Sequence, residues 1–221
     1  LLTGIPLLAV MPILALIALL YTWISGLEAS IITDFVQLLM IFGIGALILP
    51  LAWTTVGNGA ITSGFAGLEN IGSMFDPGIA FSFGIVTAIG LIAGAISDQQ
   101  YWQRAFAIKK KQLVKSFIFG AILFGIVPIA LSTLGFIAVS QNVALPEGVD
   151  ASMIGVQTIA SLLPSWAVFL FVIMLLAGLS STLDSGLSAA SSLWVTDVTK
   201  KGTVKSARHA MAGITVAGLL V

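Results

Sequence analysis

The sequence predicts an all-α fold, a polytopic transmembrane helical bundle, on three observations. Of its 221 residues, 58% are hydrophobic and only 8% are charged, whereas soluble domains carry about 25% charged residues. The mean hydropathy is +1.13. Uncharged runs cover residues 1–27, 35–53, 77–97, 116–146 and 151–183. Each run approaches or exceeds the roughly 20 residues that cross a bilayer core of about 30 Å.

These runs predict five membrane spans and the start of a sixth, at 5–24, 31–53, 79–97, 117–139, 165–195 and 210–221. The first span ends at the turn signal Ser25–Gly26, and a short link over 26–30 leads to the second. Because the chain starts inside an apolar run and ends inside another, we expect residues 1–221 to form a single transmembrane domain that is incomplete at both ends.

Two connections differ in character from the spans. Residues 54–76 contain five glycines and the acids Glu69 and Asp76 among scattered apolar residues, which predicts a loop with a short surface helix. Residues 149–163 are expected to form a short helix that lies at the surface. The sequence has no cysteine, so it holds neither a disulfide nor a thiolate metal site.

The basic residues predict the orientation in the membrane. All nine lie on two connections: Arg104, Lys109, Lys110, Lys111 and Lys115 on one, and Lys200, Lys201, Lys205 and Arg208 on the other. The connections at 54–76 and 141–164 have no basic residue, and all their charged residues are acidic. The positive-inside rule therefore places loops 98–116 and 196–209 in the cytoplasm of an integral plasma-membrane protein.

The fifth span carries an unusual number of polar side chains, in the stretch LLAGLSSTLDSGLSAASSLWV at 175–195. At about 100° per residue, one half of this helix collects small and polar residues, and leucines with Trp194 take the other half. The polar half consists of Ala177, Gly178, Ser181, Thr182, Asp184, Ser185, Ser188 and Ser192. Ser181 is roughly 24 Å below Ser165 at about 1.5 Å per residue, in the inner half of the membrane.

Two interpretations of this face stay open at the level of the residues. Hydroxyl and carbonyl oxygens with a nearby carboxylate suit a hard monovalent cation, and an intramembrane carboxylate such as Asp184 indicates a functional site. The alternative is helix packing, in which small residues allow close approach and hydroxyls bond to carbonyls.

Three stretches, in order along the chain, resemble the sodium:solute symporter family. AGLSSTLDSGLSAASSLWVTDV at 177–198 resembles the eighth core helix of that family. YTWISGLEASIITDFVQ at 21–37 resembles its glycine-containing link and Thr-Asp-x-x-Gln helix start. DQQYWQRAFAIKKKQ at 98–112 resembles the stretch at the cytoplasmic end of its sixth core helix. The resemblance implies a five-plus-five inverted-repeat fold, of which the five spans are core helices four to eight and the last segment is the start of nine.

The same resemblance implies sodium as the coupling ion and places its ligands. By position, the family's sodium site corresponds to the Gly178 carbonyl, Ser181 Oγ and Thr182 Oγ, with further ligands on core helix one. A second sodium, found in some members, corresponds to Asp34, Asp184 and Ser185. Taken alone, Asp34 is equally well read as a solvated carboxylate at a helix N-terminus, where the dipole favours it.

The resemblance also bears on the solute. Gly94 and Gly125 stand where the sugar-transporting branch has its gating Tyr and its sugar-binding Lys, so a sugar does not fit. DQQYWQRA is most similar to the urea-transporting branch. We therefore expect a small polar solute, with urea as the first choice, in a site lined by Gly90, Gly94, Ser97, Asp98 and Gly125. Tyr101 and Trp102 can instead be an interfacial anchor.

Other functions are weighed against this one. No Ser–His–acid set or phosphate-binding loop is placed convincingly, so no enzyme activity is expected. Lone His209 is expected to be solvated, and Lys109–Lys111 indicates topology or lipid headgroup contact rather than nucleic-acid binding. A proton-coupled carrier of another solute, and a transporter-like sensor fused to a signalling domain, remain as alternatives. A channel or energy-coupling subunit is disfavoured, because the spans lack several intramembrane Lys or Glu residues.

Overall fold

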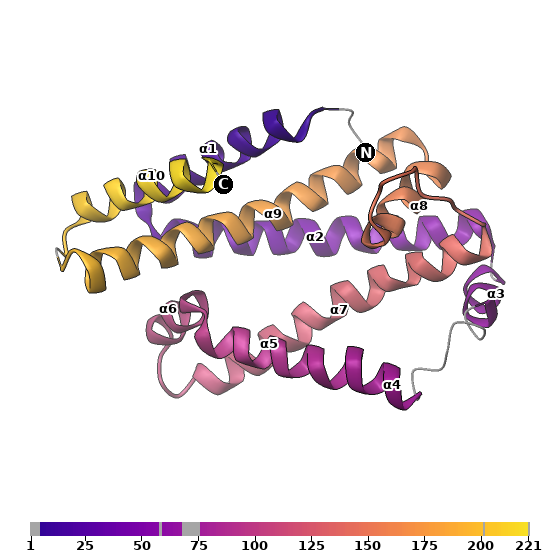
Figure 1. Cartoon of the computed structure of the whole chain (residues 1–221), viewed down its shortest axis with the longest axis horizontal. Coiled ribbons are helices and arrows are strands. Elements are labelled where there is room, and N and C mark those ends of the chain that lie inside the picture. The colour runs from indigo at the N-terminus through magenta and orange to yellow at the C-terminus, as the bar shows by residue number, and fades with distance from the viewer. Residues whose placement is uncertain (1–4, 58, 68–75, 201, 221) are drawn as a thin grey trace. The chain divides into compact units, whose positions relative to one another are not determined.

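A computed structural model describes residues 5–57, 59–67, 76–200 and 202–220 (Figure 1). The described chain consists of helices joined by turns and contains no strand, which confirms the predicted all-α class. Within it, four helical stretches are long and apolar enough to cross a membrane: Leu27–Val56, Pro77–Ser97, Leu113–Ser140 and Ser165–Val198. The first predicted span is also helical, with an apolar run of 17 residues over Leu8–Ile24.

The helices follow the predicted order closely. In sequence they are α1 (Leu7–Ser25), α2 (Leu27–Val56), α3 (Ala60–Gly67), α4 (Pro77–Ile79), η1 (Ala80–Ile85), α5 (Val86–Ser97), α6 (Gln99–Ala107), α7 (Leu113–Ser140), η2 (Ala151–Met153), α8 (Ile154–Leu162), α9 (Ser165–Leu193), η3 (Trp194–Val198) and α10 (Val204–Leu220). Of these, η1 and η3 are π-helical and η2 is a 3₁₀ turn. Glu69 and Lys201 lie outside the described residues.

The link between the first two helices is a single residue rather than the predicted five. Gly26 has φ +57° and its N–H donates to Thr22 O at 2.7 Å, which ends α1. Only glycine adopts this backbone conformation at little cost, and α2 starts at the next residue. Arg208 on α10 reaches the end of α1, where its guanidinium donates to the carbonyls of Trp23 and Ile24. A cation at a helix C-terminus satisfies carbonyls that the helix leaves open.

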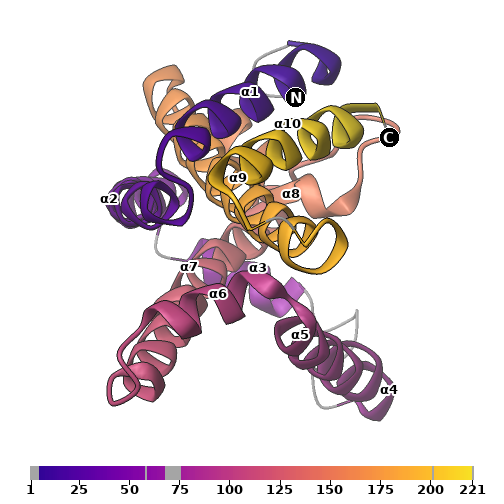
Figure 2. The ribbon, with the colours of Figure 1, turned by 90° about the vertical axis from the view of Figure 1, so that its left-hand side faces the viewer.

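The third span begins where the sequence provides a strong start signal. The Asp76 carboxylate accepts from the N–H groups of Gly78 and Ile79, and Pro77 takes the first helical position. From there α4, η1 and α5 continue as one helix to Ser97 (Figure 2). None of the residues of its apolar window is buried, so this helix has its side chains open for contact with lipid or with other protein.

Residues 42–97 and 111–173 form one compact unit. Here α3 packs on α7, with the Phe65 and Phe136 rings edge to face at 5.6 Å. Gly64 lies so close to the Phe136 backbone that a side chain would collide with its carbonyl. The short helix predicted within residues 149–163 is α8, which packs on α7 with Thr158 and Ile159 fully buried.

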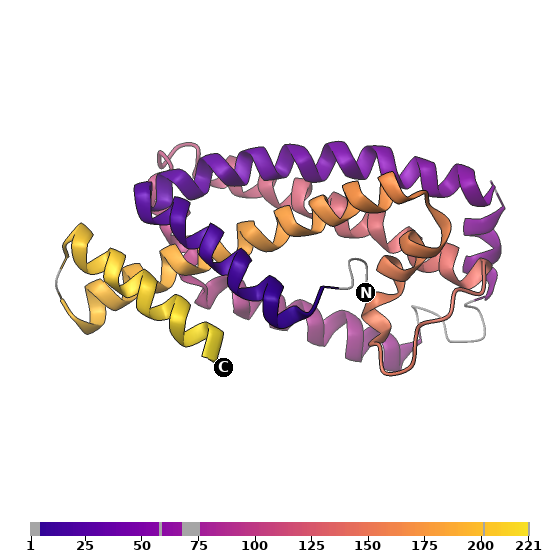
Figure 3. The same cartoon turned by 90° about the horizontal axis from the view of Figure 1, so that it is seen from above.

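Residues 5–41, 98–110 and 174–220 form the second unit. It contains α1, the first half of α2, α6, the second half of α9, η3 and α10, with α1 and α10 packed side by side (Figure 3). The last helix begins at Val204, six residues before the predicted 210, because a solvated first turn precedes its apolar part. This unit also contains the polar side chains of the site described in the next subsection: Ser30, Thr33, Asp34, Arg104, Ser181, Asp184 and Ser185.

Candidate functional site

The predicted polar face of α9 is the buried face in the structure. Asp184 is fully buried, and Ser185 and Ser188 are 4% and 5% exposed. On the opposite half of the helix, Leu179 and Leu183 are exposed. Two positions depart from this division, because Thr182 on the polar half is exposed and Leu187 on the leucine half is buried. At the other positions named here, the helical periodicity assigned the faces correctly.

Three hydroxyl groups surround the Asp184 carboxylate. Ser30 Oγ donates to Oδ1 at 3.2 Å and Ser185 Oγ donates to the same oxygen at 3.1 Å. Thr33 Oγ1 donates to Oδ2 at 3.1 Å. Hydrogen bonds to an ionised acceptor are stronger than neutral ones, so these hydroxyls stabilise a charge that would otherwise be costly to bury.

The second carboxylate, Asp34, faces the same region from α2. Arg104 Nη2 lies 2.6 Å from Asp34 Oδ2, and Ser181 Oγ donates to Asp34 Oδ1. The alternative reading of Asp34 as a solvated N-terminal carboxylate is wrong. Because α2 begins at Leu27, Asp34 lies two turns inside the helix, beyond the reach of its dipole, and its side chain is 22% exposed.

Ser185 connects the two carboxylates. Its hydroxyl donates to Asp184 and accepts from Arg104 Nη2, with the nitrogen and oxygen 2.6 Å apart. We call the resulting group the carboxylate cluster and define it by seven residues: Ser30, Thr33, Asp34, Arg104, Ser181, Asp184 and Ser185. With both carboxyl groups ionised, its two acids and one guanidinium carry a net charge of −1.

Helix α6 is held against α9 beside the cluster. The Gln103 amide donates to Ser188 O at 3.1 Å, and Ser188 Oγ lies 3.4 Å from Gln103 Oε1. At Gly186, a Cβ would lie 3.9 Å from the Gln100 amide nitrogen, so a small residue lets the two helices approach closely. Asp98 starts α6 by accepting from the Gln100 N–H at 2.8 Å. The motif DQQYWQRA thus caps α6 and docks it on α9.

One buried oxygen near the cluster lacks a hydrogen-bond partner. Gln37 Oε1 is inaccessible to solvent and no protein donor reaches it. Gln37 lies one turn beyond Asp34 on the same face of α2. A buried acceptor without a donor is costly, and such a group in a native protein is commonly satisfied by an ordered water, a ligand or an ion.

The remaining predicted sodium ligands lie at the edge of the polar face. Thr182 Oγ1 is exposed and bonds to the Gly178 carbonyl at 3.2 Å. Thr182 also lines a cavity of about 600 Å³, otherwise mainly apolar, between α1, α9 and α10. Thr182 therefore presents its hydroxyl on the side of α9 next to this cavity, while Ser181 turns towards Asp34.

The predicted solute-lining residues are found on three helices. On α5, a Cβ at Gly90 or Gly94 would meet nothing within 4 Å, and the Ser97 hydroxyl bonds to carbonyls of its own helix. Gly125 on α7 is equally open. Asp98 has the capping role described above. Tyr101 and Trp102 are 49% and 46% exposed, as an interfacial anchor would be.

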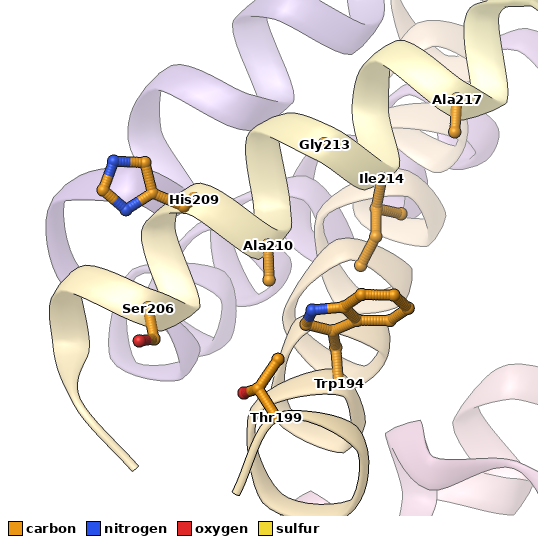
Figure 4. Close-up of a pocket in the computed structure, with 8 residues that line it drawn as sticks. All are labelled: Trp194, Thr199, Ser206, His209, Ala210, Gly213, Ile214 and Ala217. Carbon is orange, nitrogen blue, oxygen red and sulfur yellow. The ribbon is translucent and has the colours of Figure 1, made fainter. Parts of the chain in front are cut away.

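A cavity of about 490 Å³ lies at the far end of α9, with Trp194, Thr199 and Ile214 among the residues on its wall (Figure 4). His209 is exposed, as predicted, and its ring points away from Trp194 (Figure 4). Its Nδ1 lies 2.8 Å from Lys205 O, within its own helix.

Sequence reasoning missed Ser30, Thr33 and Arg104. A signal for the α2 residues was present, because Ser30, Thr33, Asp34 and Gln37 follow the i, i+3, i+4, i+7 spacing of one helical face. Arg104 belongs to the Gln-Arg pair of the DQQYWQRA motif, so the resemblance marked it among the basic residues, but only the docking of α6 on α9 brings it to Asp34.

Comparison with known proteins bears on the whole chain. No solved structure matches it. A sequence model described as "Sodium:solute symporter family" matches residues 1–219. Since this match covers nearly every residue, the chain belongs to the sodium:solute symporter family, whose members are integral membrane transporters that couple the movement of small solutes to sodium.

Proposed function

We propose that this symporter binds its sodium ion on the polar face of α9, with the Gly178 carbonyl, Ser181 Oγ and Thr182 Oγ as ligands. The observation that carries the proposal is the oxygen-rich surface between α2 and α9, of which these three groups form the edge. Hard cations bind oxygen ligands from hydroxyls, carbonyls and carboxylates. Asp34, Asp184 and Ser185 supply the compensating negative charge and the position of a second cation.

Two further features support a cation in this place. With both carboxyl groups ionised, the carboxylate cluster carries a net charge of −1, which a single sodium ion would neutralise. The orphaned Gln37 Oε1 lies on the face of α2 that carries Asp34, one turn away, where it can contribute another oxygen. A packing face would need neither the excess charge nor the unpaired acceptor.

Sodium coupling is tested by uptake into proteoliposomes that contain the intact protein. A sodium gradient should drive solute accumulation, and a proton gradient of equal size without sodium should not. Proton coupling is the rival mechanism, because a carboxylate can carry a proton. Asp34 is ion-paired with Arg104, which leaves Asp184 as the candidate proton carrier. Equal uptake with protons would overturn the proposal.

We further propose that the solute is small, uncharged and rich in hydrogen-bonding groups, with urea as the first choice. The support is the similarity of DQQYWQRA to the urea-transporting branch and the open surfaces at Gly90, Gly94 and Gly125. Ser97 and Asp98 complete the proposed lining. Uptake of labelled urea should be measured with galactose, proline and choline as competitors. Saturable galactose uptake without urea uptake would contradict this choice.

The proposed orientation has loops 98–116 and 196–209 in the cytoplasm of a cell with the protein in its plasma membrane. Residues 1–221 contain no cysteine, so single cysteines can report topology in a background without others. Lys110→Cys and Glu147→Cys both fall on exposed connections. A membrane-impermeant maleimide added to intact cells should label the Glu147→Cys variant and not the Lys110→Cys variant, and the reverse pattern would invert the assignment.

A further inference from the structure

The cavity between η3 and α10 follows one face of α10 (Figure 4). Its volume of about 490 Å³ lies within the range of about 300–1,000 Å³ that is typical of small-molecule sites. The lining residues of α10 recur at every third or fourth position: Ser206, His209, Ala210, Gly213, Ile214 and Ala217. At about 1.5 Å per residue, they extend over about 16 Å of the helix axis. This length is about half of the roughly 30 Å hydrocarbon core, which is the depth of one lipid leaflet.

The apolar wall of this cavity is accessible from outside. Gly213 and Ala217 are exposed, and a Cβ at Gly213 would meet nothing within 4 Å. Trp194 is 49% exposed, and its ring points towards α10 near Ile214 (Figure 4). Tryptophan is enriched where lipid headgroups meet hydrocarbon, so the end of the cavity next to Trp194 is expected at that level. A long apolar ligand can therefore enter the cavity from the lipid.

Positive charge gathers at the polar end of the cavity. Lys200 follows the lining residue Thr199, and Lys205 precedes the lining residue Ser206. Both lysines are exposed, and the one ion pair among the described residues lies elsewhere, in the carboxylate cluster. The Ser206 hydroxyl accepts from Thr203 Oγ1 at 3.1 Å, which leaves its own proton for another acceptor. Two cations and a hydroxyl donor at one end of an apolar cavity suit an anionic group on an apolar chain.

We propose that this cavity binds an anionic phospholipid, with its phosphate near Lys200, Lys205 and Ser206 and one acyl chain over Gly213 and Ala217. A free anion would not use the apolar wall. A further helix of the protein would cover the wall but leave the lysine charges unmatched. Each lysine near an anionic headgroup strengthens the attraction about fivefold, which favours an anionic over a zwitterionic lipid. The proposal does not depend on the sodium site or on the solute.

The test uses the intact protein in phosphatidylcholine vesicles that contain a small fraction of brominated phosphatidylglycerol or, in a second series, of brominated phosphatidylcholine. Bromine on an acyl chain quenches tryptophan fluorescence on contact, and the difference between wild type and Trp194→Phe isolates the signal of Trp194. Phosphatidylglycerol should quench this signal at a roughly tenfold lower fraction, because two lysines contribute about fivefold each. Lys200→Gln combined with Lys205→Gln should remove the preference. Lys109→Gln combined with Lys110→Gln, on the other basic connection, should keep it.

A second pair of variants separates a built cavity from general attraction of lipid to lysines. Gly213→Leu fills the cavity and should abolish the preference, whereas Gly120→Leu, at an equally open position on α7, should leave it unchanged. An unchanged preference in Gly213→Leu would overturn the cavity as the binding site, and if this variant does not fold, the lysine variants decide. Equal quenching by both lipids in the wild-type protein would contradict the proposal. Loss of the preference on addition of inorganic phosphate would identify a free anion instead of a lipid.

Discussion

Ser30 Oγ lies 3.2 Å from Asp184 Oδ1, although 154 residues separate the two positions in the chain. Both side chains are fully buried. The contact joins the first turn of α2 to the inner half of α9 and fixes the register in which Asp34 meets Ser181 directly and Ser185 through Arg104. A buried carboxylate held by hydroxyls from two helices defines a polar site inside an apolar bundle.

Ser185 is the residue whose loss should most affect the cluster, because it bonds to Arg104 and to Asp184. Hydrogen bonds to charged groups contribute about 1.5–3 kcal/mol each. Since 1.4 kcal/mol is about tenfold in an equilibrium constant, Ser185→Ala should raise the sodium concentration for half-maximal uptake by about tenfold or more. Ser191→Ala is the control, since its buried hydroxyl bonds only within α9 in this structure, to Ser188 O at 3.0 Å. Equal effects of both variants would mean that the face serves packing.

Thr182→Ala should weaken sodium binding while leaving the fold intact. The hydroxyl is exposed and bonds to Gly178 O in its own helix, so its removal disturbs no contact between helices. A lost oxygen ligand should raise the half-maximal sodium concentration roughly fivefold, or about 1 kcal/mol. Ser192→Ala, on the same half of α9 but nearly three turns further on, should leave it unchanged. Reduced levels of folded protein in both variants would favour a structural role instead.

Gly94→Tyr should abolish solute transport without unfolding the protein. A Cβ at this position meets nothing within 4 Å, so the ring would extend into open space next to α5, where the solute is proposed to pass. Gly84→Tyr on η1 is the control, because that position is equally open and lies away from the proposed lining. The measurement is urea uptake normalised to folded protein in detergent. Normal uptake by Gly94→Tyr would remove this face of α5 from the solute path.

Gly64→Ala should destabilise the packing of α3 on α7. The added methyl group would collide with the Phe136 carbonyl, which belongs to a helix backbone and cannot turn aside. Overpacking of this kind typically costs about 1–3 kcal/mol. Gly59→Ala, just before the same helix, meets nothing within 4 Å and should be neutral. Thermal unfolding in detergent compares the two, and equal melting temperatures would show that α3 can move away from α7.

The sequence by itself determined the class of the protein, the helices and the polar face of α9. Long uncharged runs permit only structures that satisfy their own backbone hydrogen bonds, and helices do so locally. The helical period then fixed which side of α9 carries Asp184 and Ser185, and the buried positions in the structure agree. The turn at Gly26 could also be predicted from the sequence. Its length was overestimated, because a glycine with positive φ reverses the chain in one residue.

Only the tertiary structure decided which partners this face meets. Asp34 was open to two readings because a carboxylate near a predicted helix start looks the same whether it is solvated or paired. The choice depended on the docking of α6, where Gln103 contacts Ser188 and Arg104 reaches Asp34, 70 positions away in the chain. Local periodicity contains no information on contacts between distant helices. Those contacts depend on which side chains fit together when the helices pack. This packing brings the Arg104 guanidinium to Asp34, for which the sequence suggested a sodium ion as the partner.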